Sequence, residues 1–92
     1  MTEQNKTYPK TVEESVNLLL STMSHENIEK LKNTPEENLI LQHHALGTHI
    51  RNEFGLWKGN QGLLNSCGVA EPDDASGVII KALWEKLRGS KT

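Results

Sequence analysis

The sequence predicts an all-α fold, a compact bundle of four to five short helices in a single domain. Apolar residues recur at helical spacing, several segments begin with an N-cap signature and end at glycine, and no segment alternates with period two. A chain of 92 residues can bury one modest hydrophobic core. We expect a flexible arm over residues 1–10, a helical domain over 11–89 and a short tail over 90–92.

The first two predicted helices are short and amphipathic. Thr11 is followed three residues later by a glutamate, a capping box for a helix over residues 12–23 whose apolar positions share one face. Ser24 has the N-cap role for a second helix, over residues 25–32, which has two apolar residues three positions apart.

The third predicted helix runs from Pro35 to Phe54. Thr34 fits its N-cap, and the two glutamates after the proline favour the positive end of the helix dipole. Gly55 fits the left-handed position that ends a helix.

Two further helices complete the predicted bundle. Asn60 can cap a short helix that Gly68 ends. The last helix begins at Pro72, where two following aspartates can accept from free backbone amides, and it ends at Gly89. A broad apolar stripe along it predicts burial.

Composition narrows the classes of function. The formal charge of −2, with basic and acidic residues interleaved, offers no cationic stripe for a nucleic-acid backbone. No apolar stretch approaches the roughly 20 residues that cross a bilayer, and the polar first residues do not form a secretory signal. We therefore expect no membrane association. The single Cys67 cannot form an internal disulfide, so we expect a cytoplasmic protein. As a small buried residue, it has no catalytic role.

Two motifs carry a resemblance to a known family. The run from His44 to Trp57 reads H-x-L-G-x-x-I-R-N-x-x-G-L-W, and P-D-D-x-S follows at Pro72, before an apolar helix. This pattern, over roughly residues 36–88, resembles a small bacterial domain family of unknown function. The resemblance implies a compact domain that joins the two motifs. It carries over no activity to this chain.

The histidines do not have the spacing of a metal site. His44 and His49 are five residues apart and His43 and His49 are six apart, so on a regular helix neither pair can close on one ion. We therefore expect no metal and no cofactor, and we place His43 at the margin of the core.

Arg51 and the pair Asp73 and Asp74 form the most informative constellation. In one interpretation Arg51, near the end of its helix, clamps an aspartate at the start of the last helix. In the other, Arg51 and Asn52 face a cleft and bind a partner. Adjacent aspartates diverge on a helix and make a poor acid–base pair, and Ser76 is a first-turn residue that helps satisfy helix amides, so we assign no catalytic residue.

The loop after the third helix offers a candidate binding surface. Trp57 either folds back onto the core or anchors an interface, and Trp84 has the same two interpretations. The leading hypothesis is a non-enzymatic protein-binding domain, such as an inhibitor, immunity-like protein or adaptor, that uses Arg51, Asn52, Trp57 and Asn60. The alternative is a small-ligand or enzymatic domain with a pocket at His44, Arg51, Asp73 and Asp74.

Overall fold

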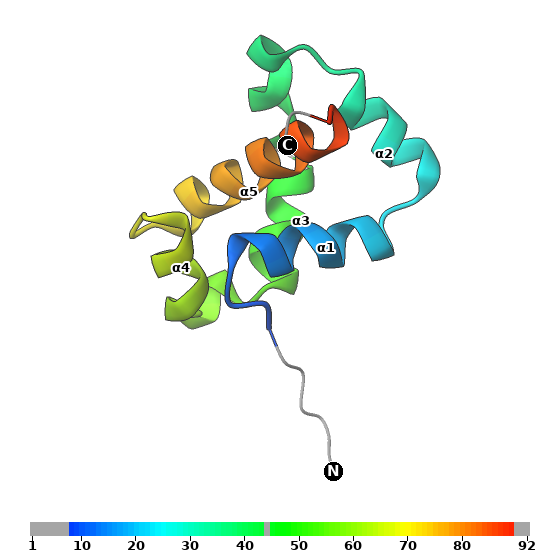
Figure 1. The fold of residues 1–92 in the computed structure, drawn as a ribbon. Coiled ribbons are helices and arrows are strands. Elements are labelled where there is room, and N and C mark those ends of the chain that lie inside the picture. The colour runs from blue at the N-terminus through cyan, green and yellow to red at the C-terminus, as the bar shows by residue number, and fades with distance from the viewer. Residues whose placement is uncertain (1–7, 44, 90–92) are drawn as a thin grey trace.

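The computed structural model describes residues 8–43 and 45–89, and all regular secondary structure in these ranges is helical (Figure 1). The prediction of an all-α fold is confirmed. None of the described helices is long and apolar enough to cross a membrane. The elements are α1 (Val12–Thr22), α2 (His25–Lys32), the 3-10 helix η1 (Glu36–His43), α3 (Leu46–Glu53), the 3-10 helix η2 (Leu56–Lys58), α4 (Gln61–Cys67) and α5 (Pro72–Leu87).

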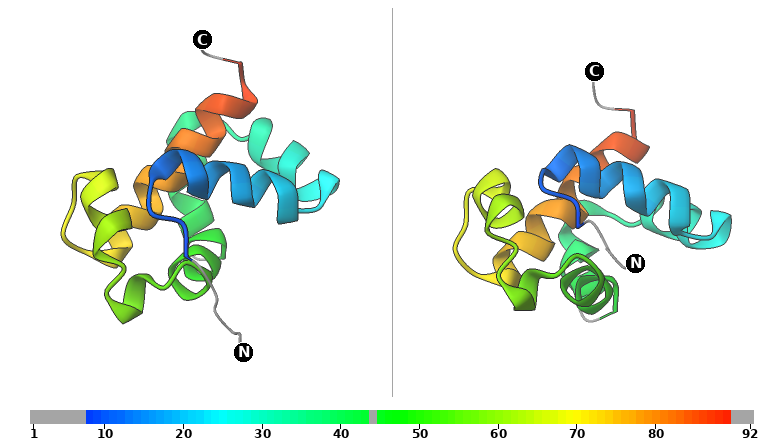
Figure 2. Two further views of the ribbon diagram at one scale, coloured as in Figure 1. Left: turned by 60° about the horizontal axis from the view of Figure 1, so that its bottom comes forward. Right: turned by 90° about the horizontal axis from the view of Figure 1, so that it is seen from below.

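Helix α5 is the centre of the fold. It contacts α1, α2, α3, α4 and η1, and the views of Figure 2 show it between α1 and α3. Its residues Ile79 and Leu83 are completely buried, as are Leu19 of α1 and Ile50 of α3. Each such side chain contributes about 1.5–3 kcal/mol through burial, so the apolar stripe of α5 organises the core.

The local capping signals of the sequence are present in the structure. The hydroxyl oxygens of Thr11 and Ser24 accept the N–H three residues later at 3.0 and 3.1 Å, and Asn60 Oδ1 does the same at 3.3 Å. Gly55 and Gly68 adopt the left-handed conformation, with φ of 70° and 75°. The starts of α1, α2 and α4 and the ends of α3 and α4 therefore follow the predicted caps.

The predicted continuous helix from Pro35 to Phe54 is wrong. It is divided into η1 and α3, and residue 44 between them lies outside the described residues. A continuous helix of this length would be a rod of about 30 Å, whereas the two shorter segments both pack against α5. Thr34 does not cap this segment, because its hydroxyl donates to the Lys30 carbonyl at 2.7 Å and so satisfies the end of α2.

The described chain before α1 contacts the helices. Pro9 is buried and its carbonyl accepts from Asn60 Nδ2 at 2.9 Å, while the Lys10 N–H donates to Glu14 Oε1 at 2.8 Å. Residues 8–10 of the predicted arm thus lie against the helical domain. The rest of that arm and the tail over 90–92 lie outside the described residues.

Candidate functional site

Arg51 is the centre of a polar cluster between α3 and α5. Its guanidinium donates from Nη1 to Ser76 Oγ at 3.0 Å and from Nη2 to Thr48 Oγ1 at 3.1 Å. Its Nε lies 3.3 Å from Asp73 Oδ1, a charge contact without hydrogen-bond alignment. Only 14% of the Arg51 side chain is exposed, so these contacts hold the guanidinium in one orientation.

The structure brings Arg51 together with Asp73 and not with Asp74. Asp73 is 76% exposed, so the pair is not the buried ion pair whose rupture costs several kcal/mol. For an exposed partner we expect about 0.2–1 kcal/mol. The buried Ser76 of α5 also links the two helices, because its Oγ accepts from Arg51 of α3, and the same hydroxyl donates within α5 to the Asp73 carbonyl at 2.8 Å.

Trp57 does not fold back onto the core. It lies in η2, and 61% of it is exposed. The Arg51 Cζ atom lies 5.9 Å from its ring centroid, within the range of a cation–π contact. The other tryptophan, Trp84, is buried and donates from Nε1 to the Thr34 carbonyl at 2.7 Å. The two tryptophans therefore take different roles, one on the surface and one in the core.

Asn60 makes hydrogen bonds within the fold from both ends of its side-chain amide. Its amide nitrogen donates to the carbonyls of Pro9 and Phe54 at 2.9 and 2.8 Å, and its oxygen caps α4. Both amide hydrogens are thus used within the chain, which gives Asn60 a structural role, and a contact with a partner stays a prediction. Asn52 is exposed on α3 and can still contact a partner.

The predicted pocket of His44, Arg51 and Asp74 falls only in part on the described residues. His44 lies outside them, as does the side chain of His43. Asp74 lines a groove whose lining does not include Arg51. In the described ranges, no group of three or more histidine, cysteine, aspartate or glutamate side chains could hold a metal ion.

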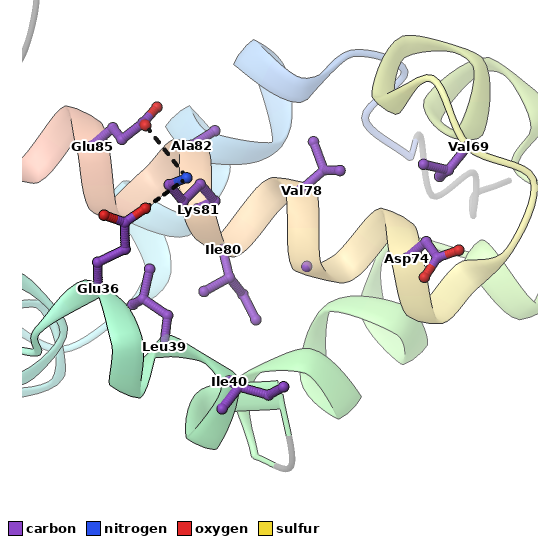
Figure 3. A pocket seen from close by; sticks show the side chains of 11 residues that line it. Glu36, Leu39, Ile40, Val69, Asp74, Val78, Ile80, Lys81, Ala82 and Glu85 are labelled. Carbon is purple, nitrogen blue, oxygen red and sulfur yellow. Dashed lines mark ion pairs between the residues drawn. The ribbon is translucent and has the colours of Figure 1, made fainter.

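The groove beside Asp74 is a feature that the sequence did not predict. It lies between η1 and α5, and its volume is about 690 Å³ (Figure 3). Apolar side chains from both helices form much of its surface, and charged side chains lie at both of its ends in Figure 3. Its lining consists of Glu36, Leu39, Ile40, Val69, Asp74, Gly77, Val78, Ile80, Lys81, Ala82 and Glu85.

Lys81 links the two sides of this groove. Its Nζ lies 3.0 Å from Glu36 Oε2 and 3.9 Å from Glu85 Oε2, as the dashed lines of Figure 3 show. The hydrogen bond that Lys81 donates to Glu36, and then the charge of Glu36, raise the pKa of Lys81 above the ordinary value of 10.5, with a smaller contribution from Glu85. The ammonium therefore stays charged at neutral pH.

A second cavity of about 460 Å³ lies between the α1–α2 connection and the start of α3. Asn27, Lys30 and His49 supply its nitrogen-bearing side chains, and Met23, Leu31 and Leu46 are among its apolar ones. These donors make it a cavity of mixed polarity.

Cys67 is half-buried, and burial raises the pKa of its thiol. Its Sγ lies 3.7 Å from the Ala75 carbonyl. A thiol with a raised pKa is a weak nucleophile at neutral pH, which agrees with a packing role for this residue.

One sequence signal could have indicated the groove. Ile40 and Val78 both line the groove. They fall outside the apolar stripes of the third and last predicted helices, which are Leu39, Leu46, Ile50 and Phe54, and Ile79, Ile80, Leu83, Trp84 and Leu87. Apolar residues left out of a helical stripe are candidates for a second surface. The four large apolar side chains most exposed among the described residues are Leu18, Ile40, Leu41 and Trp57.

Comparison with known proteins gives a family and no activity. No curated protein and no solved structure matches this chain. The family model described as "Domain of unknown function (DUF6794)" matches residues 8–87, which include α1 to α5 and the segment that carries Tyr8 and Pro9. The chain therefore belongs to the family of domains of unknown function DUF6794.

Proposed function

We propose that this domain binds another protein and that Trp57 anchors the binding surface. The observation that carries the proposal is a large aromatic side chain, 61% exposed, at a fixed position on the surface. Tryptophan and arginine are the residues most often found at the energetic centre of protein interfaces. Inhibitor, immunity-like and adaptor proteins all act through such surfaces.

The backbone under Trp57 is held at both ends. Gly55 and Gly59 flank η2 in the left-handed conformation, with φ of 70° and 82°. The Lys58 N–H donates to the Gly55 carbonyl at 3.0 Å, and the Asn60 N–H donates to the same carbonyl at 3.2 Å. A segment ordered before binding loses less conformational entropy when a partner arrives.

The side chain of Trp57 also has a fixed neighbour. Arg51 lies beside its ring and is itself held by Ser76 and Thr48. Covering the exposed part of the indole would contribute about 3 kcal/mol to binding, at roughly 25 cal/mol per Å² of apolar surface. The partner that fits has an apolar pocket for the indole and acceptor groups for the exposed Asn52 and Lys58.

Site-specific photo-crosslinking tests the proposal. A benzophenone amino acid placed at position 57 in cells that naturally produce the chain should give one discrete adduct with a protein. The same amino acid at Leu18, an exposed position on α1, is the control and should not give that adduct. The purified partner should then bind the Trp57→Ala variant about tenfold more weakly or worse, and the Leu18→Ala variant unchanged.

Two results would refute the proposal. One is the absence of any adduct at position 57 that is not also formed at position 18. The other is equal affinity of the purified partner for the wild type and for Trp57→Ala. Trp57→Ala should lose no more than about 0.5–1 kcal/mol of stability with the Arg51 contact, so the variant stays folded and its affinity can be compared with that of the wild type.

A further inference from the structure

We propose that the groove between η1 and α5 binds an amphipathic helix of a protein partner, with apolar side chains on one face and lysine or arginine at its edges. This proposal rests on the protein-binding function proposed above but concerns a different surface, since Trp57 does not line the groove. The argument uses the floor of the groove, its backbone and its charges.

The floor of the groove is apolar and continuous with the core. Leu39 of η1 and Ile80 of α5 are 7% and 1% exposed and form its inner side. Val78 is partly exposed and Ile40 is 65% exposed, so apolar surface remains open to solvent on both helices (Figure 3). Removing this surface from water is favourable, and only apolar side chains of an occupant can do so without unpaired polar groups.

The backbone around the groove favours a helical occupant. All lining residues except Val69 lie in η1 or α5, so most of their N–H and C=O groups are used within helices. An extended peptide would therefore find no strand edge to pair with, whereas a helix satisfies its own backbone. Along α5 the lining extends from Asp74 to Glu85, which is about 16 Å or three helical turns.

The charges at the edge of the groove select a basic occupant. Glu36, Asp74 and Glu85 supply three carboxylates, and Lys81 supplies the one ammonium group of the lining. The lining therefore has an excess of two negative charges. Side chains of Glu36 and Glu85 are 60% and 53% exposed, so a cation from solvent can reach them. Complementary charge of this kind gives orientation and specificity to a complex.

Lys81 shows how such a cation would be held. Its ammonium already lies between Glu36 and Glu85, at 3.0 and 3.9 Å. A lysine or arginine of the partner would take contacts at the same carboxylates and would compete with Lys81 for them. The proposal therefore predicts that removal of the Lys81 charge strengthens binding of a basic helix.

Three synthetic peptides of about 16 residues are the probes for this proposal, a length at which helices become stable in water. They share one leucine stripe at helical spacing, and the flanking positions are rich in lysine, glutamate or glutamine. Each is titrated into the full chain labelled with 15N, and the backbone amide shifts are followed by NMR. The lysine peptide should bind most tightly and should shift amides of η1 and α5 around Ile40, Val78 and Lys81.

Matched variants distinguish binding of the lysine peptide in the groove from its general attraction to an acidic protein. Ile40→Asp should weaken binding of the lysine peptide about tenfold or more, whereas Leu41→Asp should not, although Leu41 is 63% exposed and adjacent in sequence. Glu36→Gln should weaken binding and Glu37→Gln should not, since both change the net charge equally and only Glu36 lines the groove.

The proposal is overturned if the two members of either pair behave alike, if the glutamate peptide binds best, or if the shifted amides lie on other helices. It is also overturned if sedimentation shows a dimer of this chain that Ile40→Asp dissociates, because the occupant would then be a second copy. A failed peptide experiment leaves the adduct at position 57 unaffected, so the failures of the two proposals are distinguishable.

Discussion

Replacing Asn60 tests whether this side chain belongs to the fold. Its amide makes three hydrogen bonds: Oδ1 caps α4, and Nδ2 donates to the carbonyls of Pro9 and Phe54. Loss of the cap costs about 1 kcal/mol, and each neutral hydrogen bond contributes about 0.5–1.5 kcal/mol. Asn60→Ala should therefore lower the free energy of unfolding by about 2–4 kcal/mol.

Asn60→Ser separates the two contributions. Serine is as good an N-cap as asparagine but cannot reach both carbonyls, so this variant should lose about 1–3 kcal/mol. Both variants and Asn52→Ala, an exposed control on α3, are unfolded in urea and followed by circular dichroism at constant m-value. The control should change by no more than about 0.5 kcal/mol. Equal stability of Asn60→Ala and Asn52→Ala would refute the structural assignment of Asn60.

Three other predictions concern the backbone, the core and the groove. Gly55→Ala should lower the melting temperature more than Gly59→Ala. Both residues are left-handed, but only a Cβ at position 55 would lie 2.6 Å from a tyrosine ring carbon. Equal losses in a thermal melt would contradict this expectation. Trp84→Phe should cost about 1–3 kcal/mol in urea unfolding, because the indole N–H donates to a carbonyl at the end of α2; an unchanged midpoint would contradict it. Since Glu36 raises the pKa of Lys81, the ammonium stabilises the fold fully below pH 10.5 and this contribution is lost as pH rises through the raised value. The stability difference between wild type and Lys81→Gln should therefore shrink above pH 10.5, and a difference independent of pH would refute the contact.

Features that depend on neighbouring residues could be predicted from the sequence. The caps at Thr11, Ser24 and Asn60 involve an N–H three residues away, and a pattern of that length is visible in the chain itself. The helices that they start, α1, α2 and α4, lie close to their predicted positions. The apolar stripe of α5 likewise predicted a buried helix, and this helix is the centre of the core.

Contacts between distant residues could not be predicted in the same way. The Asn60 amide reaches Pro9 across 51 positions, and the Trp84 indole reaches Thr34 across 50. These partners decide that Asn60 and Trp84 are structural, whereas Trp57, with the same two sequence interpretations as Trp84, is exposed. Local pattern identifies an aromatic residue that needs a partner, and only the fold determines where the partner is.

The division of the predicted third helix explains why the groove was missed. Residues three apart are eclipsed in a 3-10 helix, so the winding of η1 aligns Glu36 with the buried Leu39 on one ridge. This alignment places a carboxylate beside an apolar floor and within 3.0 Å of Lys81 Nζ. In a regular α-helix these two side chains would be about 60° apart, at 100° per residue, so the 3-10 winding aligns them more closely.

The exposed apolar side chains concentrate on the two segments that depart from regular α-helix. Ile40 and Leu41 lie in η1 and Trp57 lies in η2, each more than 60% exposed, whereas Leu18 of α1 is only 39% exposed. The large apolar residues of the α-helices mostly face the core. The exposed apolar side chains of η1 and η2 are therefore not explained by a core too small to bury them. Departures from local rules are expected where a protein retains surface for a partner. Both proposed binding surfaces follow from this distribution, and they make different predictions because Ile40 and Trp57 can be replaced independently.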